Sequence, residues 1–143
     1  MEIIVRENPV TTFHAPAGIF AGILVNVGTG EVRTNDGPVL GPRFTFEIKV
    51  PSMRDKTVLV ARTFPPNSAK LQRFLERWLG REFMAQHAGK ALDPESLIGK
   101  EAEIAVEHIR NGGHKKPYCN VTAAYPPDTQ ELTEHFAEEA RDI

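Results

Sequence analysis

The sequence predicts a mainly β protein of the α+β class: a small five-stranded barrel with one helix between its third and fourth strands, followed by an acidic C-terminal tail. Two observations support this prediction. Apolar residues alternate with polar or small ones in five segments, and in one segment between them they recur with helical spacing. At 143 residues the chain is large enough for one hydrophobic core. We therefore expect one domain over residues 1–127 and a tail over residues 128–143.

The first three strands are predicted before residue 65. Residues 17–28 (AGIFAGILVNVG) alternate over their whole length, and two glycines would let this strand bend as it enters a barrel. Residues 29–43 are rich in glycine and proline, which predicts a long exposed connection. Alternation then returns at residues 44–50 (FTFEIKV) and 57–64 (TVLVARTF), and proline bounds both segments.

A change of period predicts the helix. Within residues 67–80 the apolar side chains form one helical stripe, made of Leu71, Phe74, Leu75, Trp78 and Leu79. Asn67 or Ser68 can cap its start and Gly80 can close its end. Residues 81–92 are expected to add a short helical piece, and residues 93–99 one further turn. We expect Phe74 and Trp78 to plug the barrel, and Phe44 and Phe46 to join the core.

The last two strands are predicted within residues 97–121 (LIGKEAEIAVEHIRNGGHKKPYCNV). Residues 102–107 alternate, Asn111-Gly112-Gly113 turns the chain, and residues 118–124 return it. Three strands, a helix and two strands is the order of the five-stranded oligonucleotide-binding (OB) fold, in which the helix covers one end of the barrel.

The charge is unevenly divided along the chain. Residues 1–127 hold 16 Lys and Arg against 13 Asp and Glu (+3), whereas residues 128–143 hold one Arg against six acids (−5). A basic body suggests a polyanionic partner, although a solvated surface with a charged tail explains the same numbers. No apolar run spans a membrane and no secretory signal opens the sequence, so a cytoplasmic protein is expected. The single cysteine, Cys119, agrees with a reducing compartment.

Five segments carry a family resemblance: AGIFAGILVNVG, RFTFEIKVP, KLQRFLERWLGREF, DPESLIGKEAEIAVEH and PYCNV. Over residues 13–127 the chain resembles small bacteriophage and prophage proteins with an OB fold, associated with replication or recombination. The resemblance implies single-stranded DNA binding without sequence preference. It implies no particular binding residues.

The binding residues are instead predicted from residue chemistry. Single-strand binders of this fold combine a basic groove with aromatic rings on which bases stack. Cations that flank turns or lie on the second to fourth strands, together with the rings of the last hairpin, are therefore the candidates: Arg43, Lys49, Arg54, Lys56, Arg62, Arg110, His114, Lys115, Lys116 and Tyr118. Tyr118, Lys115 and Lys116 are equally well explained as parts of a soluble hairpin.

Other functions find less support. No nucleophile elbow or phosphate loop is present, so we do not expect an enzyme, and no cofactor is expected. His108, His114 and Cys119 do not have the spacing of a closed zinc site. The main alternative is a phage protein-interaction or structural module that binds no nucleic acid. Leu132 and Phe136 would let the tail, as a short helix, recruit replication or recombination proteins; a homo-oligomer is also left open.

Overall fold

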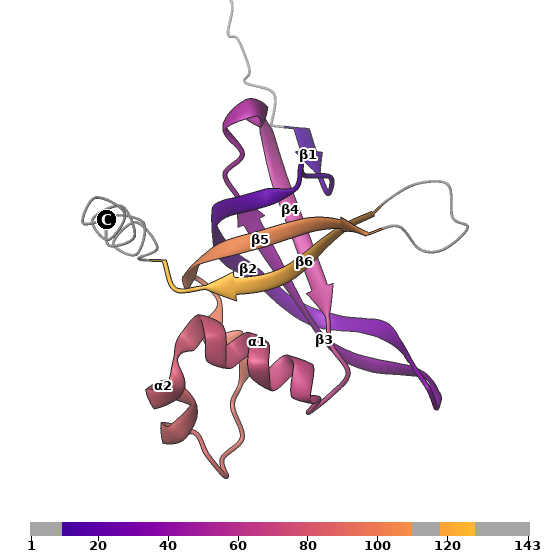
Figure 1. Cartoon of the computed structure of the whole chain (residues 1–143), viewed down its shortest axis with the longest axis vertical. Coiled ribbons are helices and arrows are strands. Elements are labelled where there is room, and N and C mark those ends of the chain that lie inside the picture. Colours follow the sequence, from indigo (N-terminus) through magenta and orange to yellow (C-terminus); the bar gives the residue numbers. More distant parts are fainter. Residues whose placement is uncertain (1–9, 110–117, 128–143) are drawn as a thin grey trace, which may run out of the picture.

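The computed structural model describes residues 10–109 and 118–127, which form a strongly curled six-stranded sheet with helices at one end (Figure 1). The strands are β1 (Val10–Thr12), β2 (Gly18–Thr34), β3 (Gly37–Ile48), β4 (Lys56–Thr63), β5 (Glu101–Ile109) and β6 (Tyr118–Tyr125). Two helices, α1 (Ala69–Leu79) and α2 (Arg81–Gln86), and the 3-10 turns η1 (Pro51–Met53) and η2 (Pro94–Leu97) complete it. No helix within these ranges is both long and apolar enough to cross a membrane.

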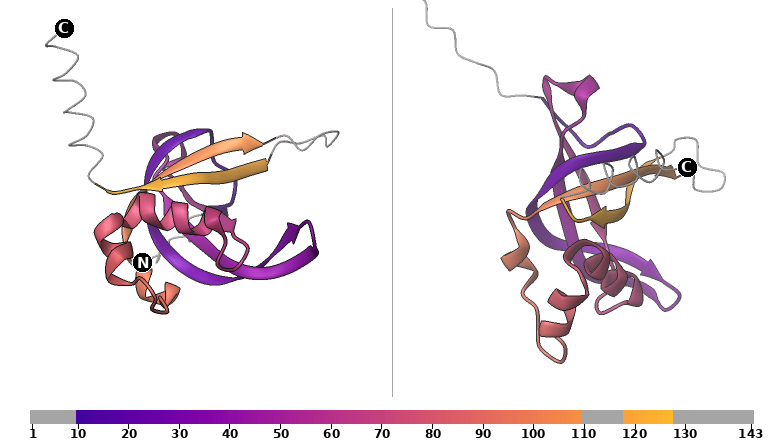
Figure 2. Two further views of the ribbon diagram at one scale, coloured as in Figure 1. Left: turned by 60° about the horizontal axis from the view of Figure 1, so that its bottom comes forward. Right: turned by 60° about the vertical axis from the view of Figure 1, so that its left-hand side comes forward.

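The strands run in the order β1-β4-β3-β2-β5-β6, and all neighbours are antiparallel except β1 and β4. The sheet curls into a half-barrel, and α1 lies across one end of it beside β6 (Figure 2). The mainly β class and the helix between β4 and β5 are as predicted. The described residues contain six strands rather than five, because the polar segment Val10–Thr12, too short to show alternation, pairs with β4.

The long exposed connection predicted at residues 29–43 is wrong. Residues of this segment instead extend β2 and β3 into a hairpin arm that projects from the sheet (Figures 1 and 2). Only two residues, Asn35 and Asp36, separate the strands, as is common in hairpins. Pro38 and Pro42 lie in the part of β3 beyond its ladder with β4, and Pro42 there only accepts, from the Phe64 N–H at 3.0 Å, so its missing donor is tolerated.

The core lies between the inner face of the sheet and α1. Phe44, Phe46, Phe74 and Trp78 are all buried, as predicted, and their rings contact one another at centroid distances of 5.4–6.4 Å. The Trp78 indole N–H donates to the Glu101 carbonyl oxygen at 2.9 Å, which ties α1 to the start of β5. Because these rings fill the core, they are not available for stacking on bases.

Strand β2 changes its inward face along its length. Phe20 and Leu24 point toward the core, but a bulge between Leu24 and Asn26 transfers the inward position to Val27. Before the bulge the outward residues of β2 are also apolar, and Ile19 is 61% exposed. Apolar residues on both sides of β2 therefore leave an apolar strip on the outside of the sheet.

Candidate nucleic-acid interface

The two sides of the half-barrel meet at β4 and β6. In the described residues no main-chain ladder joins these strands. A side chain does so instead: Nη1 of Arg62 on β4 donates to the carbonyl oxygens of Val121 at 2.9 Å and Thr122 at 3.2 Å on β6. Arg62 therefore closes the seam between β4 and β6.

Arg62 is a half-buried cation. Its guanidinium carbon lies 4.6 Å from the centre of the Phe64 ring, and burial lowers the pKa of Arg62 from its ordinary value because it disfavours the charged form. The group nevertheless stays protonated at neutral pH. Among the described residues no carboxylate forms an ion pair with it, and its Nε and Nη2 donate to none of these residues. A charge that is partly removed from water is thus left without a counter-ion in this part of the chain.

A cleft of about 380 Å³ lies at this seam, and we call it the seam cleft. It brings together the hairpin arm, the end of β4, the start of α1 and the start of β6. Its lining consists of Val32, Arg33, Ala61, Arg62, Thr63, Phe64, Pro65, Lys70, Cys119 and Asn120. Three of these residues are cations and none is a carboxylate, so the seam cleft favours an anion.

Two glycines hold the hairpin arm against the seam. Gly30 of β2 and Gly41 of β3 are paired in the ladder. A Cβ atom on Gly41 would overlap the carbonyl oxygen of Phe64, and one on Gly30 would lie 2.6 Å from the Thr63 hydroxyl oxygen. The arm can therefore approach the end of β4 this closely only because both positions lack a side chain.

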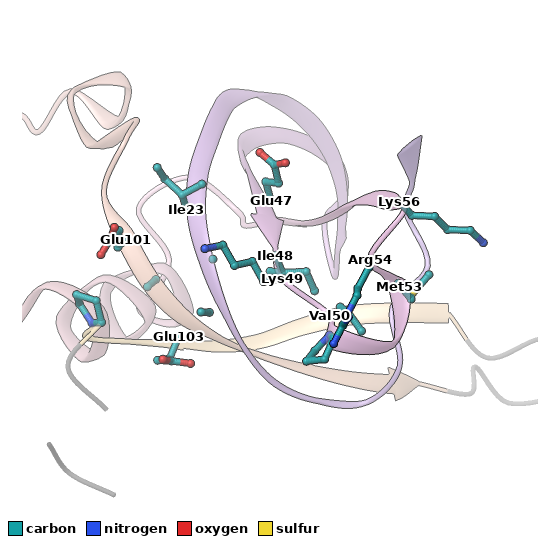
Figure 3. Close-up of a pocket in the computed structure, with 15 residues that line it drawn as sticks. Ile23, Glu47, Ile48, Lys49, Val50, Met53, Arg54, Lys56, Glu101 and Glu103 are labelled. Carbon is teal, nitrogen blue, oxygen red and sulfur yellow. The ribbon is translucent and has the colours of Figure 1, made fainter. Parts of the chain in front are cut away.

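A second, larger cleft of about 660 Å³ is lined by residues of β2, β3, β5 and the connection between β3 and β4, and we call it the Lys49 cleft (Figure 3). Its charged lining residues are the cations Lys49, Arg54 and Lys56 and the acids Glu47, Glu101 and Glu103. The acids come from β3 and β5, which flank β2 on its two sides. Equal numbers of opposite charges line this cleft, so its surface is mixed rather than basic.

The predicted binding residues are thus divided between two places. Lys49, Arg54 and Lys56 lie in the Lys49 cleft and Arg62 in the seam cleft. Arg43 is exposed on β3 and is paired with Thr63 of the seam cleft. The predicted residues Arg110, His114, Lys115 and Lys116 fall outside the described residues. Tyr118 is the first residue of β6, but its side chain is outside the description.

Sequence reasoning missed two cations of the seam cleft. Arg33 lies in the segment predicted as a connection, and the sequence predicts no role for Lys70 beyond the helix. The two-residue turn between Thr34 and Gly37 was the available indication that the chain doubles back there. No sequence pattern shows that the start of α1 lies beside this arm.

His14, His108 and Cys119 lie together around the Ala15 carbonyl oxygen. The ring of His108 lies 5.2 Å from that of His14, and its Nε2 is 2.6 Å from the Ala15 carbonyl oxygen. The Cys119 thiol donates to the same oxygen at 3.5 Å. Within the described ranges no three His, Cys, Asp or Glu side chains come together as metal ligands.

Neither protein-family models nor curated protein sequences match the chain. The resemblance to phage and prophage proteins therefore remains a prediction that depends on the five sequence segments.

Proposed function

We propose that this protein binds single-stranded DNA without sequence preference, that its half-barrel is an OB fold, and that it serves phage or prophage replication or recombination. Strands β2 to β6, with α1 between β4 and β5, follow the OB order, and β1 is an addition at the edge. In OB folds, oligonucleotides lie on the second and third strands between two loops. The equivalent strands here are β3 and β4, and β4 lines the seam cleft.

The observation that carries the proposal is the state of Arg62. Removing a cation from water is costly unless an anion compensates it. The described residues supply carbonyl oxygens and the Phe64 ring but no carboxylate, and the neighbours Arg33 and Lys70 add positive charge. A phosphate would supply the missing counter-charge and could accept from the guanidinium N–H groups that remain.

Other features support a strand of nucleic acid rather than a single anion. The start of α1 adds the positive end of a helix dipole next to Lys70. Arg33, Arg62 and Lys70 line one cleft and can meet more than one phosphate of a strand, whereas a single small anion needs only one of them. Arg43 is paired with Thr63, whereas Arg62 is paired with Phe44, so Arg43 points to the other side of the sheet from Arg62 and does not belong to this surface.

The proposal is tested by titrating a fluorescent 30-mer of dT with the protein at several salt concentrations. We expect log affinity to fall with log salt by about 0.7 for each phosphate neutralised. The variant Arg33→Ala/Lys70→Ala should bind about tenfold more weakly and reduce the slope by about two phosphates. Both side chains are exposed, so folding should be unaffected.

The matched control is Arg81→Ala/Lys90→Ala, which also removes one exposed Arg and one exposed Lys, but outside the seam cleft. It should bind as the wild type does. If the wild-type protein does not bind the oligonucleotide at low salt and micromolar concentration, the proposed function is wrong. Equal losses in both double variants would remove the seam cleft from it.

A further inference from the structure

One side of α1 is a row of cations. Lys70, Arg73 and Arg77 are exposed, and their i, i+3, i+7 spacing places them on one side of the helix. We call these three residues the α1 flank. The one acid of α1, Glu76, is paired instead with Arg81, whose Nε lies 3.3 Å from its Oε1. Within the described part of the chain no carboxylate forms an ion pair with the α1 flank.

The α1 flank follows β6. Lys70 lines the seam cleft together with Cys119 and Asn120, which lie near the start of β6. The guanidinium carbon of Arg77 lies 5.8 Å from the centre of the Tyr125 ring, at the end of β6. Helix and strand therefore lie side by side and run in the same direction (Figures 1 and 2). The α1 flank thus begins in the seam cleft and ends at an aromatic ring.

We propose that a single strand of DNA continues from the seam cleft along the α1 flank and stacks a base at Tyr125. This inference deepens the proposed function and rests on it. Lys70 and Arg77 are about 10 Å apart along the helix axis, at about 1.5 Å per residue, which is about three nucleotides of a stacked strand at about 3.4 Å each. Cations along the phosphates and a ring for a base are the two features that single-strand binders combine.

Tyr125 is the described ring that lies beside the α1 flank. The other described Phe and Trp rings that are not buried lie elsewhere: Phe20 and Phe83 pack against the core, and Phe13 follows β1, which pairs with the start of β4 rather than its end. Tyr125 is half-buried, so part of it is open to solvent. A base can therefore extend the stack that the Arg77 guanidinium and this ring already form.

A carboxylate marks where this path ends. Glu103 of β5 is paired with Tyr125 and also lines the Lys49 cleft. Paired residues point to the same side of a sheet, so a phosphate beyond the ring would meet this negative charge. The strand is therefore expected to end its contact at Tyr125 and not to enter the Lys49 cleft.

The first test is a titration of a fluorescent dT 30-mer at several salt concentrations. Arg73→Ala/Arg77→Ala should bind about tenfold more weakly, and its slope of log affinity against log salt should be smaller by about 1.4, which is two phosphates. Alanine preserves the helix, and both arginines are exposed. Arg43→Ala/Lys90→Ala is the control, because it also removes two exposed cations, but away from the α1 flank, and it should bind as the wild type does.

The outcomes separate this inference from the proposed function. If Arg33→Ala/Lys70→Ala weakens binding but Arg73→Ala/Arg77→Ala does not, the strand occupies the seam cleft and the path along α1 is wrong. Equal losses in Arg73→Ala/Arg77→Ala and in the control would also overturn the path. A wild-type protein that does not bind the 30-mer would overturn the proposed function itself.

The second test separates stacking from structure at Tyr125. Tyr125→Leu should weaken binding of the dT 30-mer about fivefold, whereas Tyr125→Phe keeps the ring and should bind as the wild type does. An abasic 30-mer has the same phosphates but no bases, so the wild type and Tyr125→Leu should bind it equally. An equal loss in Tyr125→Leu on both oligonucleotides would show that the ring only supports the fold, and base stacking there would be wrong. Circular dichroism checks that each variant is folded.

Discussion

The seam cleft and the Lys49 cleft each contain three cationic side chains, yet they differ as anion sites. The Lys49 cleft is the larger, at about 660 Å³ against about 380 Å³, but three carboxylates share it with its cations. The lining of the seam cleft contains none. Neither the number of cations nor the volume therefore identifies the better anion site; the acidic neighbours decide.

The two clefts also differ in how their cations are held. Lys49 is exposed to solvent, whereas Arg62 is half-buried and held by two carbonyl oxygens. A fixed, partly desolvated guanidinium interacts with an anion more strongly than a solvated ammonium does. Four further predictions test this difference, in order of decreasing effect.

The largest effect is expected where the hairpin arm meets the seam. Gly41→Ala would place a methyl group on the Phe64 carbonyl oxygen, so the backbone of the hairpin arm or of Phe64 must move. We therefore expect the free energy of unfolding to fall by about 3 kcal/mol. Gly28→Ala is the control on the same hairpin, because the nearest atom to its added Cβ would be 3.9 Å away. Urea unfolding measures both. Equal stability of the two variants would show that the arm does not need its close approach.

Arg62 is tested by separating its structural role from its charge. Arg62→Met leaves the Val121 and Thr122 carbonyl oxygens without this donor, and should cost about 2 kcal/mol of stability as well as DNA affinity. Arg62→Lys keeps the charge and should retain more of both. Thermal unfolding and oligonucleotide titration at a temperature where all variants are folded give the two readouts. Wild-type affinity in Arg62→Met would contradict the role of Arg62 in the seam cleft.

A smaller effect is expected at the start of α1. The Ser68 hydroxyl accepts from the Leu71 N–H at 3.2 Å and caps the helix that carries Lys70. Ser68→Ala should lower stability by about 1 kcal/mol. Hydrogen exchange should show faster opening of the first turn of α1 while the strands of the Lys49 cleft are unchanged. Unchanged exchange at the first turn would mean that the cap does not hold Lys70 in place.

The smallest effect should come from the larger cleft. Lys49→Ala/Arg54→Ala/Lys56→Ala should reduce affinity for single-stranded DNA less than about threefold, which is less than about 1 kcal/mol. If this triple variant loses more affinity than Arg33→Ala/Lys70→Ala, the Lys49 cleft is the binding site and the comparison is reversed.

The sequence by itself determined the local structure. Alternation and helical spacing are local properties, so they located the first part of β2, the last part of β3, most of β4 to β6 and the whole of α1, and they placed Phe44 and Trp78 in the core. Arg62 also falls in phase with Val58 and Val60, so alternation alone turns this cation toward the inner side of β4. The three residues of β1 were too few to show a pattern.

Only the tertiary structure decided which charges are neighbours. Arg33, Arg62 and Lys70 come from three elements, and they meet because Gly30 and Gly41 let the hairpin arm pack against the end of β4. Strand pairing likewise set the surroundings of Lys49, since it placed β5, which carries Glu101 and Glu103, on the other side of β2. Electrostatic interactions depend on distances in space, and strand register and curvature set those distances.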